Sequence, residues 1–113
     1  MLLDAEVERV NAVSAVVSLS GRMTLGMRLH EIESTLSKLV ESGVRRLVLE
    51  MSGVEYVDSA GLGLLILLYG KMKTVNGEVC LVAPRESLLQ LFQLTSTDKI
   101  LTVYPNRAAT LLD

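Results

Sequence analysis

The chain has 113 residues, of which 50% are hydrophobic but only one is Phe and none is Trp, so we expect one domain over residues 1–113 with an aliphatic core. The net charge is −2 and the best basic candidate is only Arg45-Arg46, which argues against nucleic acid as a partner. The single cysteine, Cys80, excludes a disulfide framework, and the amino terminus lacks a basic-then-apolar signal, so a cytoplasmic protein is expected.

Two short strands are predicted near the amino terminus. The strands are expected over Glu6–Val10 and Ser14–Ser20. Asn11-Ala12 supplies the turn between them, and Gly21 is expected to end the second strand.

A helix and a buried strand are predicted next. Apolar residues at helical spacing predict a helix from about Gly26 to Ser42, with Gly43 as its carboxyl-terminal cap. The apolar run inside Val44–Met51 is typical of an interior parallel strand. Ser52-Gly53 is expected to break this strand, and Val54–Val57 then leads into the next element.

The second helix is predicted from about Ser59 to Thr74. It is apolar nearly all round, so we expect it to be buried on more than one side. Lys71 and Lys73 suit the negative end of the helix dipole, and Asn76-Gly77 is expected to stop the helix. The longest apolar run, Leu64 to Tyr69, is far shorter than the roughly 20 residues of a membrane span, so no membrane insertion is expected.

The last third of the chain is predicted to hold two strands and two helices. The strands are expected over Glu78–Ala83 and near Leu101–Tyr104, and the final helix from Pro105. Pro84 is expected to open the other helix, with one face formed by Leu88, Leu91, Phe92 and Thr95. The whole order implies an α/β fold with a mixed sheet of about four to five strands and about four helices. Sites in such sheets lie at the carboxyl ends of strands.

The stretch Val57–Leu65 places one hydroxyl, Ser59, between an acid and the glycine-rich start of an apolar helix. Backbone N–H groups and the positive end of the dipole favour negative charge there. A phosphoryl group adds about −1.5 to −2 charges at neutral pH, so the position suits a switch better than a catalyst. The plainer interpretation is a helix N-cap worth about 1 kcal/mol. Asp58 either caps the helix or orients the hydroxyl, and the two roles are compatible.

Other chemistry finds little support. A serine hydrolase needs a base, and the one histidine, His30, falls on the polar side of the first predicted helix. One Cys and one His argue against a zinc site. Gly63 and Gly70-Lys71 are too far apart for a phosphate-binding loop. No cofactor, no metal and no enzymatic activity are therefore expected.

The motif Asp58-Ser59-Ala60-Gly61-Leu62-Gly63 resembles the phosphoacceptor motif of the STAS domain, as found in bacterial anti-sigma factor antagonists. The similarity covers nearly the whole chain, including the Gly21 turn, the Leu47–Val54 strand and turn, and the Leu91-Phe92 helix. The resemblance implies a STAS fold and a partner that is an anti-sigma factor of the serine-kinase type. That kinase would phosphorylate Ser59 and so release itself, and a serine phosphatase of the metal-dependent type would reverse the mark. The resemblance assigns the neighbours of Ser59 to partner binding: Asp58, Ala60, Gly61, Leu62 and Gly63.

One segment departs from the family pattern. The family commonly has Gly-Glu-Leu-Asp after the second strand, whereas this chain has Gly21-Arg22-Met23-Thr24. The change would slow phosphorylation or select another type of partner; alternatively, Arg22 meets the phosphate, or Thr24 is a second modified residue. A different function also stays open, in which the chain is a non-switching STAS scaffold or a subunit of a larger signalling or lipid-transport assembly.

Overall fold

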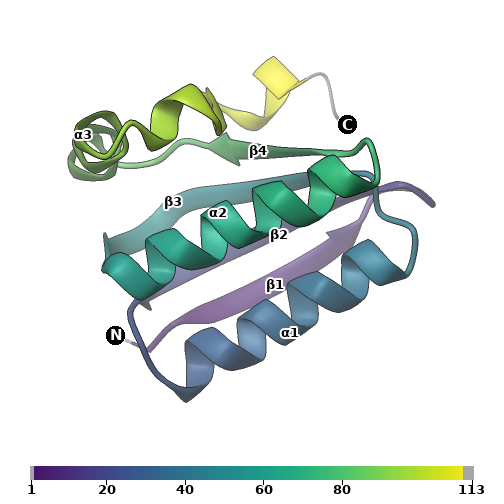
Figure 1. The fold of residues 1–113 in the computed structure, drawn as a ribbon, viewed down its shortest axis with the longest axis horizontal. Helices are drawn as coiled ribbons and strands as arrows, with labels where there is room; N and C mark the ends of the chain where they lie inside the picture. The colour runs from purple at the N-terminus through teal and green to yellow at the C-terminus, as the bar shows by residue number, and fades with distance from the viewer. Residues whose placement is uncertain (1, 111–113) are drawn as a thin grey trace.

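A five-stranded mixed sheet with three α-helices forms the computed structural model, which describes residues 2–110 (Figure 1). The strands lie in the order β1-β2-β3-β4-β5, with β1 antiparallel to β2 and the other neighbours parallel. The elements are β1 (Asp4–Arg9), β2 (Ser14–Met23), α1 (Met27–Glu41), β3 (Arg46–Val57), α2 (Ser59–Thr74), β4 (Glu78–Val82), α3 (Glu86–Leu94), the short 3₁₀ helix η1 (Thr97–Lys99), β5 (Thr102–Tyr104) and the 3₁₀ helix η2 (Arg107–Thr110). The predicted mixed α/β sheet is confirmed.

The main core lies between the sheet and the helices. Helices α1 and α2 run side by side across one face of the sheet, and α3 lies beyond α2 (Figure 1). The core side chains are aliphatic apart from Phe92, as the composition predicted. A smaller buried cluster occupies the opposite face of the sheet and is formed by Val16, Val48, Cys80 and Val82. Cys80 is therefore a buried packing residue of the sheet.

Both long strands run further than the sequence predicted. Gly21 does not end β2, which continues to Met23, and Ser52-Gly53 does not break β3. The pairing of β2 with β3 shifts register between Ser18 and Ser20 and again between Gly21 and Arg22, so two extra residues of β3 are absorbed as irregularities inside a continuous strand. A Cβ at Gly53 would lie 3.0 Å from the carbonyl oxygen of Leu19, which explains the glycine at this close approach.

Helix α2 has the predicted limits but not the predicted burial. Its buried residues all lie on the side that packs on the sheet: Gly61, Leu64, Leu65, Leu68 and Met72. Ile66 and Leu67, on the other side, remain 41% and 43% exposed. The expectation of burial on more than one side was wrong, because nothing in the described part of the chain covers the outer face. The helix thus presents apolar side chains to solvent.

The ends of the elements mostly follow local signals. The side-chain oxygen of Asn11 accepts a hydrogen bond from the Val13 N–H at 2.9 Å, which confirms the predicted turn. Gly43 has φ +107° just after α1, and Asn76 has φ +58° just after α2. Among residues 2–110, no helix is both long enough and apolar enough to span a membrane.

The last third of the chain differs in detail from the prediction. Helix α3 begins at Glu86, two residues after Pro84, and Thr95 is its exposed C-cap rather than part of the buried face. The predicted terminal helix from Pro105 is a short 3₁₀ helix, η2, and residues 111–113 lie outside the described part. Arg107 of η2 pairs with Glu8 of β1, with 3.0 Å between Nη2 and Oε2. Because β1 and β5 are the two outer strands, this pair ties the end of the described chain across the sheet.

Candidate functional site

Ser59 is the first residue of α2, directly beyond the carboxyl end of β3, and its side chain is exposed. Within β3, only Arg46–Glu50 pairs with β4, so the second half of β3 extends past β4 and pairs with β2. The start of α2 lies at the same end of the molecule as the loop between β2 and α1 (Figure 1). The structure therefore places Ser59 at the carboxyl end of the parallel strands, as the sequence predicted.

The Asp58 carboxylate holds two segments at once. Its Oδ1 accepts a hydrogen bond from the Gly61 N–H at 2.9 Å, which caps α2. Its Oδ2 accepts a hydrogen bond from the Leu25 N–H, also at 2.9 Å, in the loop between β2 and α1. The backbone N–H of Asp58 in turn donates to the Met23 carbonyl oxygen at 3.1 Å. The capping role is confirmed, and the carboxylate is engaged by backbone groups rather than by the Ser59 hydroxyl.

The same hydrogen bonds fix the charge next to Ser59. Donation from the Leu25 N–H, and then from the Gly61 N–H, lowers the pKa of Asp58 below its usual value of 3.8. Asp58 is therefore ionised at neutral pH. A phosphate on Ser59 would place a second anion beside this carboxylate.

Gly61 has a packing role as well as a place in the motif. A Cβ at this position would lie 2.3 Å from the Met23 carbonyl oxygen and 2.9 Å from the Met23 Cβ. The start of α2 is therefore seated directly on the end of β2, which only glycine permits. Gly63 differs, since a Cβ there would meet nothing within 4 Å.

This contrast predicts opposite effects of one methyl group. Gly61→Ala is expected to destabilise the fold by about 1–3 kcal/mol, because the Met23 backbone must move. Gly63→Ala, in open space on the same helix, is expected to be neutral or to stabilise by up to about 1 kcal/mol. Thermal unfolding followed by circular dichroism measures both. Equal melting temperatures for the two variants would mean that α2 is not seated on β2 as described.

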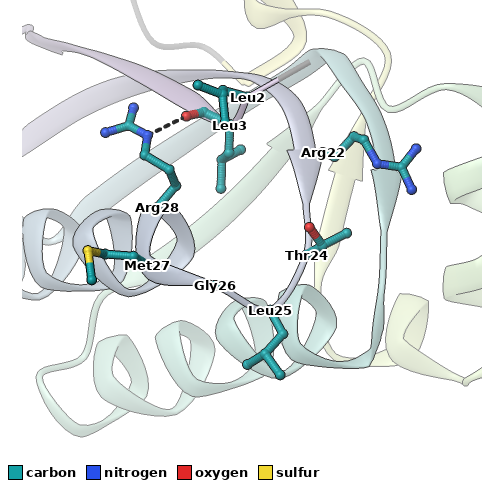
Figure 2. Close-up of a pocket in the computed structure, with 8 residues that line it drawn as sticks. All are labelled: Leu2, Leu3, Arg22, Thr24, Leu25, Gly26, Met27 and Arg28. Atoms are coloured by element: carbon teal, nitrogen blue, oxygen red, sulfur yellow. Dashed lines mark hydrogen bonds between the residues drawn. The ribbon is translucent and has the colours of Figure 1, made fainter.

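The two residues that depart from the family pattern lie in different settings. Arg22 is part of β2, in register with Tyr56 of β3, and its guanidinium carbon lies 4.6 Å from the centre of the tyrosine ring. Such an exposed cation–π contact is worth about 0.5–1 kcal/mol. Thr24 is half-buried in the loop after β2 and lines a shallow hollow with Leu25 and Arg28. Figure 2 shows Arg22 and Arg28 pointing to opposite sides of this region. The segment Gly21–Met23 is strand rather than turn.

The sequence did not indicate Met23, at the end of β2, or Leu25, in the loop that follows, although Arg22 and Thr24 on either side of Met23 were predicted as site residues. Met23 seats Gly61 and accepts the Asp58 N–H, and Leu25 donates its N–H to the Asp58 side chain. The side chain of Leu25 is 82% exposed, and that of Met27 is 78% exposed. Leu25 and Met27, large apolar residues on either side of Gly26, were the available signal for the exposed side chains, but not for the Leu25 backbone contact. Leu62 and Ala60 are both half-buried and pack against the core.

Comparison with known proteins agrees with this geometry. The sequence profile of the STAS domain matches residues 4–110. The chain belongs to the STAS domain family. Relatives of this STAS chain include a Bordetella bronchiseptica protein with the provisional name anti-sigma factor antagonist BtrV. It is 29% identical over 79 residues, which are 70% of this chain and 68% of that protein.

Solved structures show the same fold. An anti-sigma factor antagonist from Mycobacterium paratuberculosis is 28% identical, with a TM-score of 0.81 over 97% of this STAS chain and 92% of that one. The anti-sigma factor antagonist SpoIIAA matches in its unphosphorylated form with a TM-score of 0.81 at 18% identity, over 95% and 93% of the two chains. The phosphorylated form of the Bacillus protein SpoIIAA matches with a TM-score of 0.76 at 18% identity, over 95% and 96%.

Proposed function

We propose that this chain is a non-enzymatic anti-sigma factor antagonist that binds a serine-kinase-type anti-sigma factor and is switched off by phosphorylation of Ser59. The observation that carries the proposal is the exposed Ser59 hydroxyl at the first position of α2, beside a carboxylate already engaged by backbone N–H groups. The names of the relatives, and the existence of SpoIIAA in phosphorylated and unphosphorylated forms, support it.

The proposed mechanism is electrostatic and steric. Unmodified, the start of α2 offers the kinase small residues, Ala60 and Gly63, around the hydroxyl. A phosphate adds bulk and charge inside that contact, next to the ionised Asp58. Desolvating an unpaired dianion at an interface is costly, so the complex dissociates. The domain itself stays folded, because the helix N-terminus tolerates negative charge. A serine phosphatase of the metal-dependent type would then restore binding.

Incubation with the anti-sigma kinase of the same genome and ATP tests the proposal. Intact-mass measurement is expected to show one added phosphate, and peptide mapping is expected to place it on Ser59. Ser59→Ala should take up none, whereas Thr24→Val, which removes the other hydroxyl of the site, should be labelled at the wild-type rate.

Three outcomes would contradict parts of this proposal. Labelling of Ser59→Ala would mean that another residue is the acceptor. Loss of labelling in Thr24→Val would make Thr24 a modified residue. No labelling, together with no binding to the kinase, would favour the scaffold function.

A further inference from the structure

Three contacts join the end of β2, and the loop that follows it, to the residues around Ser59. The Asp58 Oδ2 accepts the Leu25 N–H, the Met23 carbonyl accepts the Asp58 N–H, and Gly61 is seated on Met23. The last two contacts hold the end of β2. Of these three contacts, only the hydrogen bond from the Leu25 N–H to the Asp58 Oδ2 reaches the loop itself.

The hydrogen bond from the Leu25 N–H to Asp58 holds in place a residue whose large apolar side chain is exposed. Leu25 is 82% exposed, so the fold gains little from its burial, yet its backbone is bonded to a charged acceptor. Hydrogen bonds to charged groups are stronger than neutral ones. The result is an apolar side chain held in solvent, with its backbone bonded to the residue that precedes Ser59.

The two carboxylate oxygens of Asp58 accept hydrogen bonds from different segments. Oδ1 caps α2 through Gly61, which is a role that Ser and Asn fill as well as Asp does. Oδ2 accepts the hydrogen bond from the Leu25 N–H of the loop. An acceptor with one oxygen would keep the helix and release Leu25.

We propose that Asp58 is a positioning residue that holds Leu25 as the second contact of the partner surface, beside Ser59. This inference rests on the proposed function. The partner is the same anti-sigma factor that contacts Ser59, and the inference requires it to have an apolar socket for Leu25. The bonded backbone keeps the loop next to the start of α2, so we expect a partner that covers Ser59 to reach Leu25 as well. Preorganising the loop in this way removes its ordering cost from binding.

The test compares Asp58→Ser with Leu25→Ala and with the double variant. Asp58→Ser retains one acceptor for the Gly61 N–H, and its helix is expected to stay capped. Amide hydrogen exchange at Leu25 is expected to speed up by about tenfold, as for the loss of a hydrogen bond to a charged acceptor. The Val13 N–H is the matched control, because it also donates to a side-chain oxygen at 2.9 Å but at the other end of β2, and it should not change.

Binding to the kinase with ADP gives the readout that a purely structural role would not move. Asp58→Ser and Leu25→Ala should each bind about fivefold to tenfold more weakly than wild type. The double variant should be no weaker than the weaker of the two single variants, since both changes remove the same contact. Val13→Ala removes part of a 51% exposed side chain far from Ser59 and should bind like wild type. Asp58→Asn repeats the test if the serine variant melts early.

The outcomes separate this inference from the proposed function. If wild type does not bind the kinase, the proposed function fails. If wild type binds the kinase and both single variants bind it as tightly as wild type does, the positioning role is overturned. Additive losses in the double variant would also overturn it, because Asp58 would then act independently of Leu25.

Discussion

Phosphorylation of Ser59 is expected to weaken binding to the anti-sigma kinase on the order of a hundredfold or more. The phosphate adds up to two charges at an exposed position next to the ionised Asp58, and the interface must desolvate both anions. Ser59→Ala removes only the hydroxyl and should bind like the unmodified protein. Ser59→Asp adds one charge and should fall between them. Titration calorimetry with the kinase and ADP ranks the four forms.

The melting temperature of Ser59→Asp is the stability control for this ranking of affinities. A carboxylate near a helix N-terminus is favourable by about 0.3–1 kcal/mol, so Ser59→Asp should melt within a few degrees of wild type. Weaker binding by this variant then reports on the interface and not on unfolding. Equal affinity for the phosphorylated and unmodified proteins would rule out the switch, because a mark without differential binding shifts no equilibrium.

Leu65→Asp is expected to prevent folding. The Leu65 side chain is fully buried between α2 and the sheet, and an unpaired carboxylate there has no hydrogen-bond partner. Circular dichroism should show loss of the native spectrum or of the cooperative thermal transition. The loss of stability is comparable with the whole free energy of unfolding of a small domain.

The matched control lies two residues further along the same helix. Leu67 is 43% exposed on the outer side of α2, so Leu67→Asp should fold and melt close to wild type. The pair differs in burial but not in chemistry. A native spectrum for Leu65→Asp, or an unfolded one for Leu67→Asp, would show that the buried face of α2 has been misassigned.

The limits of α2 could be predicted because local residues specify them. Asp58 caps the first turn, Lys71 and Lys73 lie in the last turn, and Asn76 adopts positive φ just beyond. Its buried side could not be predicted, because apolar residues occupy the outer face as well and leave no periodic signal. The continuity of β3 was also missed, since Gly53 is accommodated by the register of β2 rather than by anything local.

As with the fold, the parts of the site that are specified by neighbouring residues could be predicted, and the parts that depend on distant residues could not. Ser59 and its cap are adjacent in sequence, so the motif indicated both. The Leu25 N–H lies 33 residues before Asp58, and a backbone donor leaves no mark in the sequence. A contact of Arg22 with the phosphate stays a prediction, whereas its stacking on Tyr56, its register partner on the neighbouring strand, could not be predicted. Long-range pairing of this kind is set by the sheet, which local patterns do not encode.

The Asp58 side chain holds the loop through the backbone N–H of Leu25, a main-chain group that every residue type except proline supplies. Substitutions at position 25 or beside it can therefore change what the loop displays without loosening what holds it. Related chains that coexist in one cell would be free to diverge here, each matching its own kinase and avoiding the others, while the acceptor serine and its cap stay fixed. We expect Thr24, which lies in the same loop beside Leu25, to vary with the partner as well.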